Sequence, residues 1–240
     1  MESVILENLR NIRSKIELAC TKSKRQISDI ILVAVTKNVP EELIEIAIDI
    51  SKEDPNAVPI NIIGENRVQE ALEKYPKIQR KVEWHLIGHL QTNKVKKALE
   101  IFSMIQSLDS FHLAQEIEKR ACSISKVMPV LIEVNTSQEP SKFGIKPEDL
   151  FILINQILSL KHLNILGLMT LGPGLAVEDK EKSRPCFRLL YELKQKVEQE
   201  FKIKLPYLSM GMSSDFEVGI EEGSNMIRIG TAIFGPRRAT

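Results

Sequence analysis

Residues 30–36 read IILVAVT, a continuous apolar run in which most residues are β-branched. This composition predicts a strand that is buried on both faces, as in a parallel sheet covered by helices. Upstream of it, apolar residues recur at alternating spacings of four and three, which predicts an amphipathic helix. These residues are Ile5, Leu9, Ile12, Ile16 and Ala19. A helix and a buried strand therefore open the chain, as in an α/β protein.

The same alternation continues along the chain. Seven more apolar runs have the length of strands: residues 60–63, 82–87, 102–105, 127–134, 163–168, 205–209 and 226–229. Stretches with helical spacing separate them: residues 41–50, 67–74, 93–99, 111–124, 148–158, 185–201 and 216–222. Strands joined by helical crossovers run parallel. Eight such units in 240 residues predict an α/β fold, a single (β/α)8 TIM barrel over residues 1–240. An open doubly wound sheet is the alternative, but no GxGxxG motif follows the first strand.

Composition excludes several classes of protein. The chain has 33 Lys and Arg against 32 Asp and Glu, a balance that argues against a polybasic nucleic-acid binder. No apolar run is long enough to span a bilayer, and Glu2, Glu7 and Glu17 interrupt the N-terminal segment where a signal peptide would be apolar. The three cysteines, at positions 20, 122 and 186, show no CxxC spacing and are expected to be reduced thiols. We therefore expect a cytoplasmic protein with no nucleic-acid or membrane partner.

Lys37 directly follows the first predicted strand. In a barrel of this kind, chemistry lies at the C-terminal ends of the strands. An amine at the mouth of an apolar barrel is poorly solvated, which favours the neutral form that condenses with carbonyl compounds to a Schiff base. The alternative is a lysine whose stem lies on apolar surface while its ammonium reaches water.

A candidate anion site follows the last two predicted strands. Ser213 and Ser214 precede Asp215 and a helical stretch, so their hydroxyls and the first free amides of that helix point to one place. Gly230 and Thr231 add backbone amides directly after the eighth strand. Phosphate binds after strands seven and eight in many barrels of this type. The alternative is that the serines and Asp215 only cap the helix.

The pair His85 and His89 has the spacing of some metal ligands. It is predicted to lie on a strand and its turn, however, and no third ligand is evident. We interpret both residues as structural or orienting histidines and predict no metal site.

Six stretches of the chain resemble, in order, the YggS/PROSC family of pyridoxal 5′-phosphate (PLP) homeostasis proteins. They are LVAVTK (residues 32–37), IGENRVQE (63–70), WHLIGHLQTNK (84–94), SKFGI (141–145), GLMT (167–170), and SMGMSSDF with GSNMIRIGTAIFG (within 209–235). The last of these is specific by itself. Thr36 stands where the family usually has serine, and residues 51–59 resemble a modest insertion.

This resemblance implies a single PLP-binding barrel domain of the alanine-racemase N-terminal type. By the same likeness, Lys37 holds the cofactor as an aldimine and Asn66 flanks it. Ser213 or Ser214, with Gly230 and Thr231, holds its phosphate, and Arg228 faces the pyridine nitrogen. The implied cofactor-binding residues are Lys37, Asn66, Ser213, Ser214, Arg228, Gly230 and Thr231.

Arg228 also suggests which chemistry the site supports. It lies between Ile227 and Ile229, so strand alternation places its side chain on the opposite face from both. A fixed cation beside the ring nitrogen keeps that nitrogen unprotonated and makes the ring a weak electron sink. Racemisation by two bases needs an acid–base group opposite the lysine, and the chain is predicted to have no second domain that would supply one.

The leading hypothesis is therefore a binding protein without catalytic residues, which holds PLP on Lys37 and acts in intracellular PLP homeostasis. Delivery of the cofactor to PLP-dependent apo-enzymes is an extension of this hypothesis. The alternative is a PLP-dependent amino-acid racemase that uses His85, His89 or a cysteine as its second base. A third hypothesis is a barrel enzyme that binds another phosphorylated substrate and has no cofactor. We expect a monomer.

Overall fold

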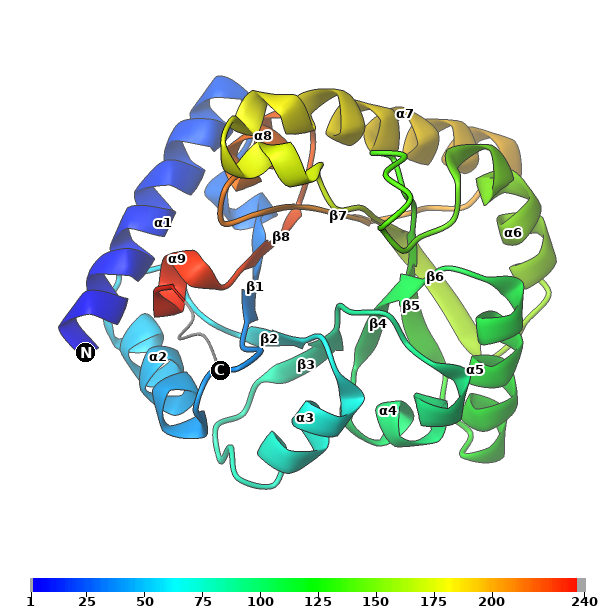
Figure 1. Cartoon of the computed structure of the whole chain (residues 1–240), viewed down its shortest axis with the longest axis horizontal. Coiled ribbons are helices and arrows are strands. Elements are labelled where there is room, and N and C mark those ends of the chain that lie inside the picture. Colours follow the sequence, from blue (N-terminus) through cyan, green and yellow to red (C-terminus); the bar gives the residue numbers. More distant parts are fainter. Residues whose placement is uncertain (1, 237–240) are drawn as a thin grey trace.

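The computed structural model describes residues 2–236 and shows eight parallel strands that close into a barrel (Figure 1). The strands are β1 (Ile31–Val35), β2 (Ile62–Glu65), β3 (Glu83–Leu86), β4 (Met104–Leu108), β5 (Met128–Glu133), β6 (Leu163–Met169), β7 (Tyr207–Met212) and β8 (Met226–Ile229). They follow one another around the barrel in chain order, and β8 pairs with β1. The predicted (β/α)8 TIM barrel is confirmed, and the doubly wound alternative is wrong.

Helices connect the strands and lie outside their ring (Figure 1). They are α1 (Glu2–Lys22), α2 (Glu41–Glu53), α3 (Val68–Lys74), α4 (Val95–Ile101), α5 (Phe111–Ser123), α6 (Leu150–Ile157), α7 (Arg184–Phe201), α8 (Phe216–Glu221) and α9 (Thr231–Phe234). Short 3-10 turns are η1 (Ile27–Asp29), η2 (Thr92–Lys94), η3 (Pro147–Asp149), η4 (Gly174–Val177) and η5 (Lys180–Ser183). Within residues 2–236, none of the helices is both long and apolar enough to cross a membrane.

The strands separate two apolar layers because successive side chains point to opposite faces. Leu32 and Ala34 of β1 belong to the layer between sheet and helices, whereas Val33 between them faces the barrel interior. The buried interior cluster is Val33, Met104, Leu131, Met169 and Met226. Polar side chains share this interior with the cluster, and they lead toward the candidate site.

Two strands, β4 and β7, end three residues beyond their predicted ends. β4 continues past its apolar start through Gln106 and Ser107, both fully buried, and β7 runs on to Met212. These polar residues interrupt the apolar run, but their side chains find hydrogen-bond partners inside the fold. At the end of β7 the chain turns through Gly211, whose φ is +96° and where a Cβ would lie 2.7 Å from the Cα of Phe216. Only glycine fits that turn without strain.

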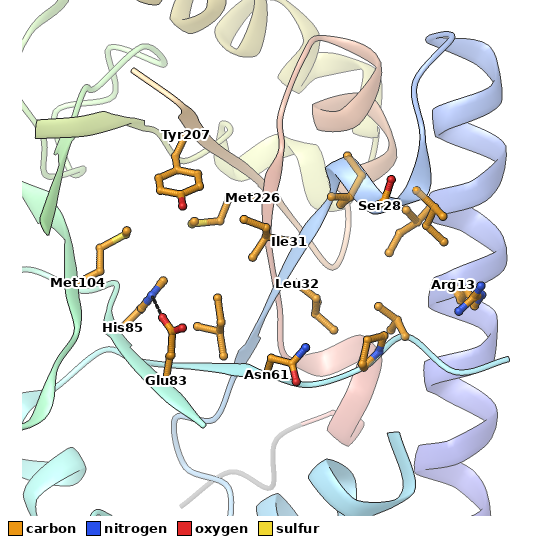
Figure 2. Close-up of a pocket in the computed structure, with 16 residues that line it drawn as sticks. Arg13, Ser28, Ile31, Leu32, Asn61, Glu83, His85, Met104, Tyr207 and Met226 are labelled. Carbon is orange, nitrogen blue, oxygen red and sulfur yellow. Dashed lines mark ion pairs between the residues drawn. The ribbon is translucent and has the colours of Figure 1, made fainter. Parts of the chain in front are cut away.

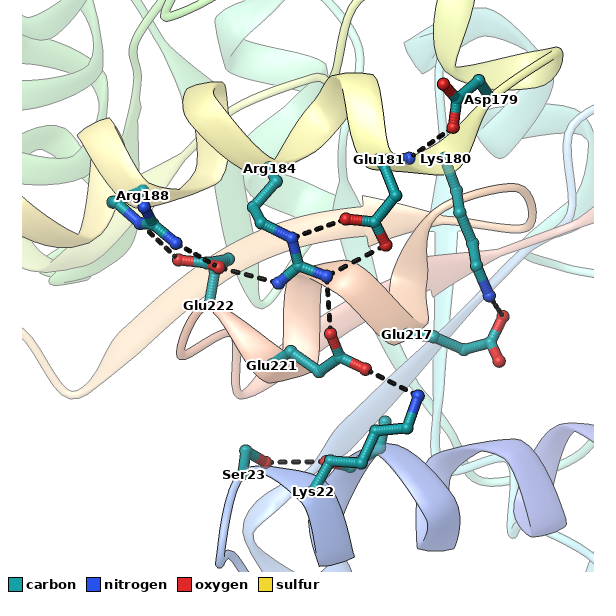
Figure 3. A network of polar contacts seen from close by, with 11 residues as sticks. Lys22, Ser23, Asp179, Lys180, Glu181, Arg184, Arg188, Glu217, Glu221 and Glu222 are labelled. Carbon is teal, nitrogen blue, oxygen red and sulfur yellow. Dashed lines mark hydrogen bonds and ion pairs between the residues drawn. The ribbon is translucent and has the colours of Figure 1, made fainter.

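Charged side chains join the helices beside this turn. Arg184 of α7 contacts Glu221 at 2.7 Å and Glu222 at 2.8 Å, both at the end of α8. Lys22 of α1 contacts the same Glu221 at 3.2 Å. Figure 3 shows these ion pairs linking α7 and α8 to α1, which is far from both in sequence. The network fixes α8, which begins directly after the candidate anion site.

Candidate functional site

The residues predicted to bind a cofactor lie at the C-terminal ends of four adjacent strands, β7, β8, β1 and β2. Lys37 follows β1, and Asn66 follows β2. The register pairs Ala34 of β1 with both Ile229 of β8 and Ile63 of β2, so these strands end at one level. The fold therefore brings the predicted residues to one arc of the barrel mouth.

Two backbone amides converge on the hydroxyl of Ser213. The amides of Gly230 and Ala232 both donate to Ser213 Oγ, at 3.3 Å each. Gly230 leaves little space for a side chain, since a Cβ there would lie 3.1 Å from the carbonyl oxygen of Val35. Ser214 is half-buried beside this point, and Thr231 begins α9. Amides that reach a hydroxyl oxygen in this way also suit a phosphate oxygen.

The helix-capping alternative for this turn is not what the structure shows. Asp215 is the N-cap residue of α8 but makes no side-chain capping bond to that helix. Its Oδ1 accepts from the amide of Met212 at 2.7 Å, and its Oδ2 accepts from the hydroxyl of Ser183 at 2.5 Å. The carboxylate therefore shapes the turn that presents Ser213.

Arg228 points into the barrel, as strand alternation predicts. Its Nη1 donates to Ser209 Oγ at 2.6 Å, and its Nη2 donates to the carbonyl oxygen of Thr170 at 2.7 Å. The side chain is buried, and desolvation lowers the pKa of the guanidinium to about 10, opposed by the charges of Glu133 and Asp215. A fixed cation thus lies in the barrel below the arc of predicted residues.

Asn66 is half-buried at the end of β2. The end of β3 passes directly over its backbone, because a Cβ at Gly88 would lie 2.3 Å from the carbonyl oxygen of Asn66. Glycine at position 88 is therefore required by this close approach.

Lys37 is half-buried, and its two neighbours are both anchored by carboxylates, the buried Glu65 and the half-buried Glu70. The hydroxyl of Thr36 donates to Glu65 Oε1 at 2.7 Å. On the other side, the amide of Asn38 donates to Glu70 Oε1 at 2.6 Å. Asn38 adopts a left-handed conformation with φ of +59°, which asparagine tolerates better than most residues. Both contacts fix the short turn that carries the lysine.

Sequence reasoning missed the charged groups that hold this turn. Lys74 contacts both Glu65 and Glu70, and burial raises the pKa of the Glu65 carboxyl while Lys74 lowers it. Two signals could have revealed them: the carboxylate that directly follows the buried run 60–63, and the i,i+4 spacing of Glu70 and Lys74.

Glu133, the last residue of β5, was also missed. Its side chain is buried, and desolvation raises its pKa to about 7, against the lowering effect of Arg228. A carboxyl in an apolar β-branched run is a signal that sequence reasoning could have used. Glu133 is therefore a buried titratable acid on β5, the strand that lies across the barrel from β1.

The two histidines do not share a site. Nδ1 of His85 lies 2.9 Å from the amide nitrogen of Gln106 in the barrel interior. His89 lies at the rim, with Nδ1 3.1 Å from Asp109 and its ring stacked on Phe143. Among residues 2–236, no group of three or more His, Cys, Asp or Glu side chains could hold a metal ion.

The residues present fit a phosphorylated carbonyl compound. An amine, two convergent amides and a buried cation lie around one barrel mouth. The chain is a barrel of the alanine racemase N-terminal domain class, whose family model matches residues 7–238. Its lysine follows the first strand, and Ser213 with its two convergent amides follows the last two strands.

Relatives narrow this assignment. A pyridoxal phosphate homeostasis protein of Aquifex aeolicus is 43% identical over 97% of this chain and 98% of its own length. The protein of the same name from Escherichia coli K12 is 34% identical over 97% of each chain. The chain belongs to the family of pyridoxal phosphate homeostasis proteins, as its motifs predict.

Solved structures give the same picture. PipY of Synechococcus elongatus, solved with PLP bound, superposes with a TM-score of 0.81 at 32% identity and covers 96% of this chain and 100% of PipY. Alanine racemase of Clostridium difficile reaches a TM-score of 0.74 at 16% identity, and the match spans 60% of the racemase. The second likeness shows the fold alone.

Proposed function

We propose that this chain binds PLP through the amine of Lys37 and acts in intracellular PLP homeostasis. Ser213, Ser214, Gly230 and Thr231 hold the phosphate. The observation that carries this proposal is the convergence of two backbone amides on Ser213, at the same barrel mouth as Lys37. The PLP-bound structure of PipY supports it.

Each further residue has a defined task in this proposal. Arg228 faces the pyridine nitrogen and keeps it unprotonated, while Asn66 flanks the ring. When bound, PLP supplies a reactive aldehyde conjugated to an electron-withdrawing ring. A cation at the ring nitrogen weakens that electron withdrawal, which suits storage of the aldehyde better than turnover of an amino acid.

The racemase hypothesis has weaker support. The two histidines named as second bases are engaged elsewhere, His85 by Gln106 inside the barrel and His89 by Asp109 and Phe143 at the rim. The relatives from Aquifex aeolicus and Escherichia coli, at 43% and 34% identity, bear the name of homeostasis proteins. Deuterium exchange at Cα of alanine distinguishes the two functions, because appreciable exchange that depends on Lys37 would establish catalysis.

An absorbance spectrum tests the proposal directly. Purified protein mixed with PLP is expected to show a band near the visible edge that borohydride removes, and mass mapping is expected to place the reduced label on Lys37. Lys37→Ala is expected to lose the band. Lys94→Ala is the matched control, because Lys94 is also half-buried and lies after β3. Labelling of a different lysine would overturn the assignment.

The wider proposal concerns partners and location. We propose that residues 1–240 form one PLP-binding domain that acts as a monomer in the cytoplasm and releases PLP to apo-enzymes. Transfer is tested by mixing PLP-loaded protein with an apo-enzyme while a scavenger removes free PLP. Activation no faster than from the scavenged free pool would contradict direct delivery.

A further inference from the structure

A line of buried polar side chains runs through the barrel interior away from Arg228. Arg228 Nη1 donates to Ser209 Oγ at 2.6 Å, and Ser209 Oγ donates to Gln106 Oε1 at 2.7 Å. The amide nitrogen of Gln106 lies 2.9 Å from Nδ1 of His85. The other ring nitrogen of His85 lies 3.7 Å from Oε2 of Glu83. We call these five residues, contributed by β8, β7, β4 and β3, the interior polar chain.

The direction of each contact follows from the arginine. A guanidinium only donates, so Ser209 Oγ accepts from Arg228 and gives its own proton to Gln106 Oε1. The amide NH2 of Gln106 then faces His85, whose Nδ1 accepts. The imidazole proton therefore lies on Nε2, directed toward Glu83. Every acceptor turns its negative end toward Arg228, and hydrogen bonds aligned in this way strengthen one another.

Packing alone does not account for these residues. Gln106 and Ser209 are fully buried, and His85 and Arg228 are each only 2% exposed. Their neighbours in the barrel interior are the apolar side chains of the interior cluster, which is the usual filling of such a barrel. Polar groups there cost free energy unless they are hydrogen-bonded, so their main contribution is to Arg228, whose charge they stabilise through neutral acceptors.

The far end of the interior polar chain reaches water. A cavity of about 500 Å³ at the N-terminal end of the barrel is lined by Glu83 and His85, together with the first residues of β1, β2, β4, β7 and β8. Figure 2 shows the Glu83–His85 pair beside Met104, Met226 and Tyr207. The Glu83 side chain is 65% exposed, and its contact with His85 lowers the pKa of its carboxyl. The interior polar chain thus has the solvated carboxylate of Glu83 at one end and the buried cation of Arg228 at the other.

We propose that Gln106 and His85 are positioning residues for Arg228. Through Ser209 they fix the guanidinium so that its remaining N–H groups point toward the pyridine nitrogen of the cofactor. This inference deepens the proposed function and rests on it, because it assumes that the ring lies beside Arg228.

The hydrogen-bond directions in the interior polar chain can be tested without cofactor. Long-range proton–nitrogen spectra of the isotope-labelled protein, recorded at mildly alkaline pH, report which nitrogen of His85 carries the proton. We expect Nε2, and a proton on Nδ1 would overturn the proposal. In the same sample the two Nη groups of Arg228 are expected to give separate, slowly exchanging signals, which Gln106→Met averages.

The absorbance spectrum of bound PLP tests whether this positioning of Arg228 affects the cofactor. Gln106→Met keeps the side-chain volume but removes the acceptor for Ser209, so the absorbance of bound PLP is expected to shift and its Kd to rise several-fold. Gln106→Glu retains an acceptor oxygen and is expected to restore most of the wild-type spectrum. Ser107→Ala is the control, because Ser107 is the next residue on β4, equally buried, and donates instead to the carbonyl of Gly88.

Besides a proton on Nδ1 of His85, three outcomes would overturn the proposal: a folded Gln106→Met variant with the wild-type spectrum and Kd, an equal shift in Ser107→Ala, or no rescue by Gln106→Glu. If Gln106→Met does not fold, the His85 tautomer in the unaltered protein tests the proposal: a proton on Nε2 supports it and a proton on Nδ1 overturns it. If the unaltered protein takes up no PLP, the proposed function fails. The Nη signals of Arg228 in wild type and Gln106→Met then still show whether the interior polar chain positions the guanidinium.

Discussion

The amine of Lys74 donates to the backbone carbonyl of Thr36 at 2.7 Å, and so holds the residue that precedes Lys37. The same amine lies 2.9 Å from Glu65 and 2.6 Å from Glu70. Lys74 and Glu65 are both buried, which is rare for these residues unless they are paired. A charged cluster between β2 and α3 thus fixes the turn that presents Lys37.

Replacing Lys74 by methionine tests this cluster. The variant keeps the apolar stem but leaves Glu65 as a buried carboxylate without a cation, which is expected to lower the free energy of unfolding by about 3–5 kcal/mol. Urea denaturation measures the loss. Lys77→Met is the control, because Lys77 pairs with Glu41 on the surface, and its loss is expected to lower the free energy of unfolding far less. Adding Glu65→Gln to Lys74→Met is expected to recover much of the stability, and equal losses for Lys74→Met and Lys77→Met would contradict the cluster.

The fold could be predicted because its strands are apolar on both faces. Each apolar run marked a strand, and the run that ended at residue 36 placed Lys37 at the correct end of the barrel. Prediction failed where the barrel interior is polar. Gln106 stopped the predicted fourth strand early, although its side chain is bonded inside the barrel.

The candidate site could be predicted only as far as it is continuous in sequence. Ser213 and Gly230 lie in segments whose residue types indicate anion binding, and the structure joins them by a hydrogen bond. The contact between Lys74 and Thr36 joins residues 38 positions apart, and no local pattern indicates it. The raised pKa of Glu133 depends on burial and on the charge of Arg228 from another strand. Such pairings follow from how the strands and helices pack in the barrel, which no local pattern encodes.

Loss of the serine hydroxyls is expected to weaken phosphate binding selectively. The double variant Ser213→Ala with Ser214→Ala removes hydrogen bonds to a charged group, each typically worth about 1.5–3 kcal/mol. The Kd for PLP is therefore expected to rise at least tenfold, while the Kd for pyridoxal, which lacks the phosphate, changes little. Fluorescence or absorbance titration with both compounds measures this difference. An equal loss of affinity for PLP and for pyridoxal would mean that the phosphate does not bind at these serines.

Charge and geometry at Arg228 can be separated by two substitutions. Arg228→Gln removes the cation, so the ring nitrogen is expected to gain a proton and the spectrum of bound PLP to shift, while affinity falls less than in Lys37→Ala. Arg228→Lys keeps the charge but cannot hold both Ser209 and Thr170 with a planar fork. Its spectrum is expected to stay closer to wild type than that of Arg228→Gln. Identical spectra in all three proteins would place Arg228 away from the ring.

Glu133 is expected to make the cofactor-free protein less stable as pH rises. Its pKa is about 7 in the fold against 4.5 for a free side chain, because burial disfavours the charged form. Between these values the folded state binds the proton more tightly than the unfolded state, so the contribution of Glu133 to stability is greatest below pH 4.5 and is lost as pH rises through about 7. The full difference corresponds to about 3 kcal/mol.

Glu133→Gln removes this titration and keeps the shape of the side chain. The difference in unfolding free energy between wild type and Glu133→Gln, measured by urea denaturation across this pH range, is expected to favour the variant increasingly toward neutral pH. Glu100→Gln on the exposed face of α4 serves as the control and is expected to change stability little at any pH. A difference that stays constant from acid to neutral pH would mean that the pKa of Glu133 is the same in the folded and unfolded states, so that Arg228 compensates its burial fully.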